Sequence, residues 1–171
     1  MTLRADKILD PASSGVDVDG VTIRDSLVRT RFSWELSASA AQSITTGAVR
    51  TVTFSTTQWD TYPGGIADLA NNRVTVPVTG KYYCSFKSTI DDININLKCY
   101  FFVNTTIVRN AFFHTRVLTN STWGGYDCII EASAGDHISV GVQSYVGGVV
   151  IGNFSSNLWL RTRFQGYFIG E

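Results

Sequence analysis

The chain has 171 residues, of which 44% are apolar, 12% are aromatic and only 16% are charged. That length is enough for one domain with a substantial core, but typical soluble domains are roughly one quarter charged, so we expect part of the surface to be hidden in an oligomer. The 14 basic and 14 acidic residues balance without a run of either sign, which leaves no basic stripe of the kind that nucleic acid or anionic lipid binds.

The first segment, residues 1–30, is polar and differs from the rest of the chain. It has no apolar stretch long enough for a signal peptide, and no window of the chain reaches the ~18 apolar residues of a membrane span, so we expect no membrane insertion. Its one short alternating run, Val16 to Ile23, cannot bury much apolar surface alone. Residues 1–30 are therefore predicted to be an arm that a partner orders.

From residue 31 onward, apolar side chains recur at every second position, which is the period of a β-strand. In the first strands the residues expected to face the core are Val52 and Phe54, then Val74, Val76 and Val78, and, after a turn at Thr79-Gly80, Tyr82, Cys84 and Phe86. Pro77 cannot donate a ladder hydrogen bond, so it is expected at an edge or a bulge.

The later strands follow the same period. Residues 96–104 are apolar on both faces, which predicts a strand buried on both sides. Residues 125–146 predict a hairpin that turns at Ala134 to Asp136, and the closing strand places Phe164 toward the core. Many strands separated by Gly, Asn and Asp turns favour an all-β, two-sheet antiparallel sandwich over residues 31–171.

Three cysteines, Cys84, Cys99 and Cys128, occur without the spacing of a metal site. We expect them to be buried thiols in strands, as in a protein that folds in a reducing cytoplasm.

Several weak motifs occur in a characteristic order along residues 32–170, and the residues that carry them are Pro77, Gly80, Tyr82, Gly135, Asp136, Phe164 and Gly166. This order resembles the C1q/TNF-like jelly roll, in which Pro-x-x-Gly-x-Tyr-x-Phe precedes a late Gly-Asp turn and a terminal Phe-x-Gly. The resemblance implies a jelly-roll sandwich assembled as a homotrimer around aromatic and aliphatic side chains.

The arm carries a second resemblance, through Gly15, Val16, Val18, Asp19, Gly20, Val21, Ile23 and Asp25. This run is similar to a short arm that precedes fibre or decoration domains in structural proteins of tailed bacteriophages. Physically it predicts two very short strands around a tight Asp-Gly turn, suited to pairing with neighbouring chains. The candidate attachment residues are Val16, Val18, Asp19, Val21 and Ile23.

The sequence contains no recognisable catalytic motif, so we expect no enzymatic activity and no cofactor. Its only histidines, His114 and His137, do not supply the His cluster with a carboxylate that a metal-dependent jelly-roll enzyme needs. Asp91 and Asp92, followed by Asn94 and Asn96, offer oxygen ligands of the kind calcium binds. A solvated loop between strands explains this pattern equally well, and no metal site is predicted.

Gly-rich turns are predicted at residues 60–65, 121–127 and 144–148, and five aromatic residues lie in or beside them, namely Trp59, Tyr62, Trp123, Tyr126 and Tyr145. Loop aromatics can stack on sugar rings or anchor a protein interface. They can also cap the ends of the sandwich or fill a contact between subunits, and the sequence leaves these alternatives open.

Together these observations favour a non-enzymatic virion structural protein, made in the host cytoplasm. The leading hypothesis is a trimeric capsid decoration (cement) protein of a tailed phage, with the arm bound to the major capsid protein or another virion protein and the jelly roll protruding. Only residues 1–30 precede the domain, whereas a tail fibre normally has a long shaft. The alternative is a fibre-tip or head-fibre module that binds host-surface saccharide through the aromatic loops.

Overall fold

The computed structural model describes residues 16–18, 21–23, 32–91, 94–116, 122–145, 149–152 and 162–170. The chain divides into two units, Met1–Arg31 and Phe32–Glu171. Each unit is described by itself below.

In the first unit, strands β1 (Val16–Val18) and β2 (Val21–Ile23) pair antiparallel. In their register Val16 lies opposite Ile23 and Val18 opposite Val21. The predicted pair of short strands is therefore confirmed. Asp19, one of the candidate attachment residues, lies outside the described residues.

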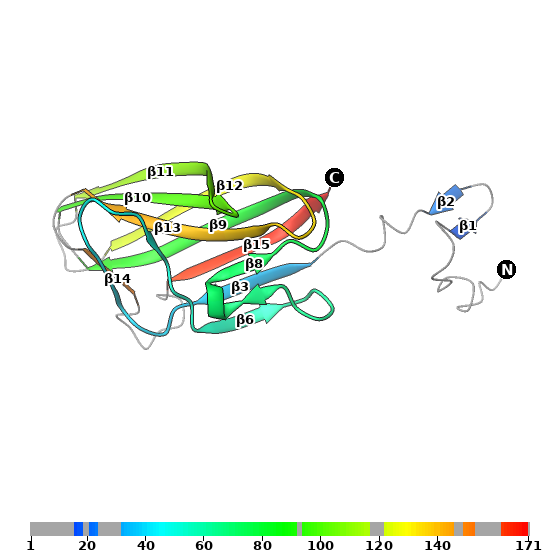
Figure 1. Cartoon of the computed structure of the whole chain (residues 1–171), viewed down its shortest axis with the longest axis horizontal. Helices are drawn as coiled ribbons and strands as arrows, with labels where there is room; N and C mark the ends of the chain where they lie inside the picture. The colour runs from blue at the N-terminus through cyan, green and yellow to red at the C-terminus, as the bar shows by residue number, and fades with distance from the viewer. Residues whose placement is uncertain are drawn as a thin grey trace. The chain divides into compact units, whose positions relative to one another are not determined.

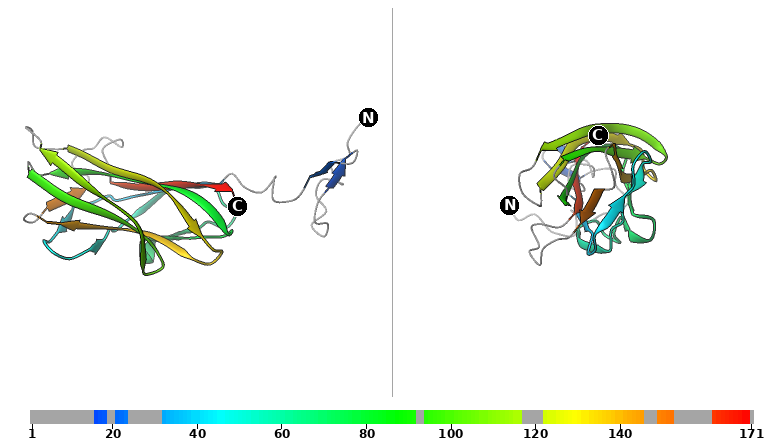
Figure 2. Two further views of the ribbon diagram at one scale, coloured as in Figure 1. Left: turned by 90° about the horizontal axis from the view of Figure 1, so that it is seen from above. Right: turned by 90° about the vertical axis from the view of Figure 1, so that its left-hand side faces the viewer.

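The second unit contains two antiparallel sheets that face each other (Figures 1 and 2). We call the first the β9 sheet; its order is β4-β14-β9-β15-β3-β6, and β12 pairs with the other edge of β9. Its strands are β3 (Ser33–Ser37), β4 (Gln42–Ile44), β6 (Thr56–Asp60), β9 (Gly80–Asp91), β12 (Thr122–Ala132), β14 (Val149–Gly152) and β15 (Arg163–Gly170).

The second sheet, here the β13 sheet, has the order β11-β10-β13-β8-β7, and β5 also pairs with β13. Its strands are β5 (Arg50–Thr51), β7 (Ala67–Asp68), β8 (Arg73–Thr75), β10 (Asn94–Val103), β11 (Thr106–Arg116) and β13 (His137–Ser144). A short 3-10 helix, η2 (Leu69–Asn71), joins β7 to β8. The two-sheet antiparallel sandwich predicted from the alternation is confirmed.

The core between the sheets is aromatic. Trp34 and Phe164 are fully buried and meet edge to face, with ring centroids 5.9 Å apart. Gly166 makes room for the indole, because a Cβ at that position would lie 2.4 Å from Trp34 Cζ2. The residues predicted to face inward in the first strands are buried, namely Val52, Phe54, Val74, Val76, Tyr82, Cys84 and Phe86, except that Val78 is partly buried and packs against the core.

The predicted hairpin over residues 125–146 is wrong. β12 pairs with β9, whereas β13 pairs with β10, β8 and β5 in the opposite sheet. The turn between them crosses the sandwich and is held by backbone hydrogen bonds from Gly135 N–H to Val76 O and from Val76 N–H to Asp136 O. Alternation shows which side chains face inward, but it is the same for two strands of one sheet and for two strands of facing sheets.

Strand β10 was expected to be buried on both faces, and it is so only in part. Leu97, Cys99 and Phe101 are fully buried in the core. On the other face Tyr100 is also buried, but Lys98 and Phe102 are partly exposed.

The three thiols face the core, as predicted. Cys84 and Cys99 are fully buried and Cys128, opposite Cys84 in the sheet, packs against the core while half-buried. Burial raises the pKa values of the Cys84 and Cys99 thiols well above the usual range of a thiol. Burial also raises the pKa of the Cys128 thiol to about 12.

Because the thiolate is the reactive form, these cysteines should resist modification. At pH 8, about one in ten thousand Cys128 thiols is ionised if its pKa is about 12. A thiol reagent is therefore expected to label none of the three until denaturant is added, after which all three react. Rapid labelling of all three in the native protein would contradict their placement.

Candidate functional site

The face of the β9 sheet that points away from the core carries large apolar side chains on three adjacent strands, and those on the two outer strands are exposed. Tyr83 of β9 lies opposite both Tyr167 of β15 and Ile129 of β12. The Tyr83 and Tyr167 rings stack with centroids 4.9 Å apart and an interplanar angle of 25°. Tyr167 is 48% exposed, Ile129 51% and Ile169 47%. We call these four residues the Tyr83 patch.

A contiguous group of large apolar side chains on a sheet face marks an interaction site rather than ordinary surface. The stacked tyrosine rings are also held by each other, so little side-chain entropy is lost when a partner covers them. Burial raises the pKa of Tyr83, and the carboxylate of neighbouring Asp127 raises it further. The patch is therefore a candidate surface for contact with another macromolecule.

Charged groups lie beside the patch on the same face. Glu35 of β3 is only 6% exposed, and Arg163 Nη1 of β15 lies 3.9 Å from Glu35 Oε2. Burial raises the pKa of the Glu35 carboxyl above its usual range, although Arg163 lowers it in part. Trp59 of β6 lies opposite Glu35 and is 45% exposed.

The five aromatic residues predicted as a loop surface do not come together in one place. Trp59 lies on the outer face of the β9 sheet, whereas Tyr145 follows β13 in the other sheet. Tyr62 packs edge to face on Phe32, and Tyr126 packs on Phe101, so both contact the core.

The segment 121–127 was expected to form a Gly-rich turn, and this is wrong because β12 runs through both of its glycines. Gly125 lies close to β9, where a Cβ would be 3.0 Å from Phe86 O. Trp123 belongs to β12, but its side chain lies outside the described residues.

Tyr145 belongs to a separate cluster on the outer face of the β13 sheet. The hydroxyl groups of Tyr100 and Tyr145 both donate to Gln143 Oε1, the latter at 2.9 Å, and Gln143 Nε2 donates to Gly47 O at 3.0 Å. Burial, together with the hydrogen bond to Tyr145, raises the pKa of Tyr100 to about 12. Lys98 Nζ lies 5.1 Å from the Tyr100 ring centroid.

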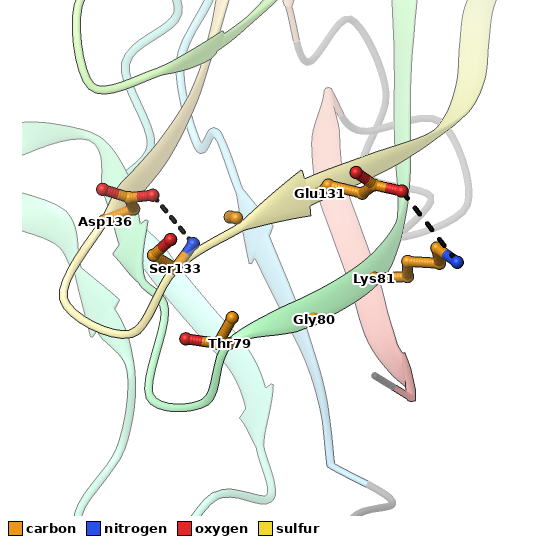
Figure 3. Close-up of a pocket in the computed structure, with 7 residues that line it drawn as sticks. Thr79, Gly80, Lys81, Glu131, Ser133 and Asp136 are labelled. Carbon is orange, nitrogen blue, oxygen red and sulfur yellow. Dashed lines mark hydrogen bonds and ion pairs between the residues drawn. The ribbon is translucent and has the colours of Figure 1, made fainter.

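Figure 3 shows a hollow where β9 begins and β12 ends. Lys81 and Glu131 point toward each other across the two strands, with Lys81 Nζ 3.9 Å from Glu131 Oε1. The Asp136 carboxylate accepts hydrogen bonds from Asn104 Nδ2 and from the Ser133 N–H, which lower its pKa. Asp136 therefore stabilises its own turn, as Asp residues in turns commonly do.

The remaining candidate residues are the two histidines and the acidic pair Asp91 and Asp92. His137 Nδ1 lies 3.3 Å from Thr75 Oγ1, and the side chain of His114 is outside the described residues. Asp91 ends β9, but its side chain and all of Asp92 also lie outside them, so the calcium alternative stays untested. Within the described ranges, no group of three His, Cys, Asp or Glu residues could hold a metal ion. No helix in the same ranges is long and apolar enough to cross a membrane.

Sequence reasoning missed the Tyr83 patch, although a signal for it was present. Each of its strands contains consecutive apolar residues, Tyr82-Tyr83, Ile129-Ile130 and Tyr167 to Ile169, which place apolar side chains on both faces. One face fills the core, and the other carries the side chains of the Tyr83 patch.

No protein-family model and no curated protein matches the sequence. Solved structures do match the fold. Murine APRIL, in a crystal structure at pH 5.0, aligns with a TM-score of 0.57 and 12% identity over 81% of this chain and 99% of that one. Eiger TNF from S. frugiperda aligns with a TM-score of 0.58 and 11% identity over 84% and 95%.

The globular domain of zebrafish complement 1qA protein aligns with a TM-score of 0.51 and 12% identity, over 81% of this chain and 97% of that one. The likeness concerns the fold, and it agrees with the order of motifs found along residues 32–170. The domain therefore has a jelly-roll fold that resembles those of C1q and TNF proteins.

Proposed function

We propose that the chain is a non-enzymatic structural protein that assembles as a homotrimer through the outer face of the β9 sheet. The observation that carries this proposal is the Tyr83 patch, in which three large apolar side chains, Ile129, Tyr167 and Ile169, are about half exposed. The resemblance to the C1q/TNF-like fold implies the same oligomeric state. The low content of charged residues gives independent support, since it suits a protein whose surface is partly covered.

A trimer built on this face needs a contact of more than ~1,000 Å² per pair of subunits to be stable. A closed ring of three copies uses heterologous contacts, in which one part of the surface meets a different part of the next copy. The outer face of the β9 sheet provides both parts, because it extends from the edge strand β12 to the edge strand β6.

The proposed place of this trimer is the virion of a tailed phage, as a capsid decoration protein. The arm supports this role, because its run from Gly15 to Asp25 resembles the arms of phage structural proteins. Its β1–β2 hairpin belongs to a unit separate from the jelly roll, which suits an attachment element. The major capsid protein, or another virion protein, is the proposed partner of the arm.

Deleting residues 1–30 tests the attachment role. The truncated protein is expected to keep its oligomeric mass and melting temperature, because the core lies within Phe32–Glu171. It should no longer bind particles that lack the native protein, measured by co-sedimentation. Replacing Val18 and Val21 by Asp should have the same effect, since charge would stand where an apolar contact is expected.

A truncated protein that still decorates particles at full occupancy would contradict attachment through the arm. Attachment would then use the jelly roll, and the arm would be a linker or a clasp within the trimer.

Binding of host-surface saccharide is the second candidate function. The cluster around Tyr145 favours it, because an exposed aromatic ring held by hydrogen bonds beside a side-chain amide suits a sugar ring. Binding of the intact protein to a glycan array, lost in Tyr145→Ala, would favour this function over capsid decoration.

A further inference from the structure

Two charged side chains beside the Tyr83 patch each have a buried atom that lacks a hydrogen-bond partner within the chain. Glu35 Oε2 and Arg163 Nε are both buried atoms without a hydrogen bond, and the 3.9 Å between Arg163 Nη1 and Glu35 Oε2 is too long for one. The Arg163 side chain is nevertheless 21% exposed. A guanidinium carries five donors, so Arg163 has donors available to a second carboxylate that reaches it from outside.

The strand register places an acidic side chain at the same level on the opposite edge of this face. Asp127 of β12 lies opposite Ser85 of β9. Ser85 in turn lies opposite Gln165 of β15, and Gln165 lies opposite Glu35 of β3. These four residues therefore form one row across the sheet, and Arg163 is two residues from that row along β15. Asp127 is exposed.

Asp127 does not form an ion pair with Arg163 within one chain. Strand β9 lies between β12 and β15, and two strand spacings amount to about 10 Å. A contact between these two side chains must therefore come from two copies of the chain.

We infer that, in the proposed trimer, Asp127 of one copy binds Arg163 of the next. This inference rests on the proposed function, since it assigns the partner of that same face to a second copy. In a ring whose axis runs along the strands, a rotation moves each residue around the axis but keeps its level along the strand. In the inferred ring, the β12 edge of one copy meets the β15–β3 region of the next copy. Asp127 of the first copy then has the same level along the strands as Glu35 of the second copy, and it is within reach of Arg163 of that second copy.

This contact gives the apolar patch a fixed register. Apolar side chains hold surfaces together but specify their alignment weakly, whereas a charge pair penalises misaligned arrangements. Arg163 bound between Glu35 of its own chain and Asp127 of its neighbour also satisfies donors that one chain leaves unpaired.

Charge reversal tests the contact. The full-length variants Asp127→Arg and Arg163→Asp are each expected to raise the dissociation constant of the trimer at least ~10-fold, because each places like charges together. The double variant D127R/R163D restores the pair in reversed order and should recover most of the loss. Dissociation is measured by sedimentation velocity over a dilution series, and circular dichroism checks the fold. Lys98→Glu, on the outer face of the β13 sheet, is the control and should leave the dissociation constant unchanged.

A trimer whose stability is unaffected by either single reversal would overturn this contact while leaving the proposed assembly in place. Loss in both single variants without recovery in the double variant would also overturn it. A monomeric wild-type protein would instead remove the assembly itself, and the contact with it.

A cross-linking experiment supplies a second measurement that does not depend on charge. The variant carrying both Asp127→Cys and Arg163→Cys should form covalent dimers and trimers on mild oxidation, seen on a non-reducing gel. Each single cysteine variant should not give a covalent trimer, because the native thiols face the core. Absence of cross-linked trimer from the double variant would count against the contact.

Discussion

Tyr167→Asp is expected to convert the trimer into a folded monomer at micromolar concentration. Tyr167 is 48% exposed and stacks on Tyr83, so in the proposed trimer its ring contributes to the contact with the next copy rather than to the core. A carboxylate at this position would lose its hydration when the surfaces meet and would find no partner in an apolar patch. Gel filtration with light scattering measures the mass, and circular dichroism measures the fold.

Tyr167→Phe is the matched control, because it keeps the ring and removes only the hydroxyl. It should assemble as the wild type does. If Tyr167→Asp retained the oligomeric mass, the contact would lie elsewhere on the molecule and the Tyr83 patch would not be the assembly surface.

Phe164→Ala is expected to have the largest effect on folding. Phe164 is on the same strand as Tyr167 but faces inward, is fully buried, and lies within 6.0 Å of the rings of Trp34, Phe54 and Phe101. Truncating a buried Phe costs about 3–5 kcal/mol, which is a large part of the ~5–15 kcal/mol that stabilises a domain.

Urea unfolding at one fixed protein concentration measures this loss, since assembly makes the apparent stability depend on concentration. Ile107→Ala serves as the control, because Ile107 is 45% exposed on β11 in the other sheet. A surface truncation of this kind should change the free energy of unfolding by less than about 0.5 kcal/mol. Equal losses in the two variants would show that Phe164 does not fill the core as described.

The alternation of apolar residues was sufficient to predict which side chains fill the core. Tyr82, Cys84 and Phe86 share one parity on β9 and are all buried, because a strand places successive side chains on opposite faces. The choice of strand partners could not be predicted in the same way. β12 and β13 are consecutive and joined by a short turn, yet they lie in different sheets.

The assembly surface was harder to predict than the core for a physical reason. Aromatic residues near glycines predict a binding surface in loops, but Tyr126 lies in a strand and packs on Phe101. Tyr83 and Tyr167 are far apart in the sequence and next to inward residues, so their stacking depends on the pairing of β9 with β15. The two-residue period of a strand identifies apolar residues on the outer face. Only the register in which the strands pair brings these residues together.

The oligomeric mass of the full-length chain tests the central claim most directly. Gel filtration with light scattering at micromolar concentration should give a mass near three times the 18.8 kDa of one chain. A mass near 18.8 kDa under the same conditions would contradict assembly through the β9 sheet.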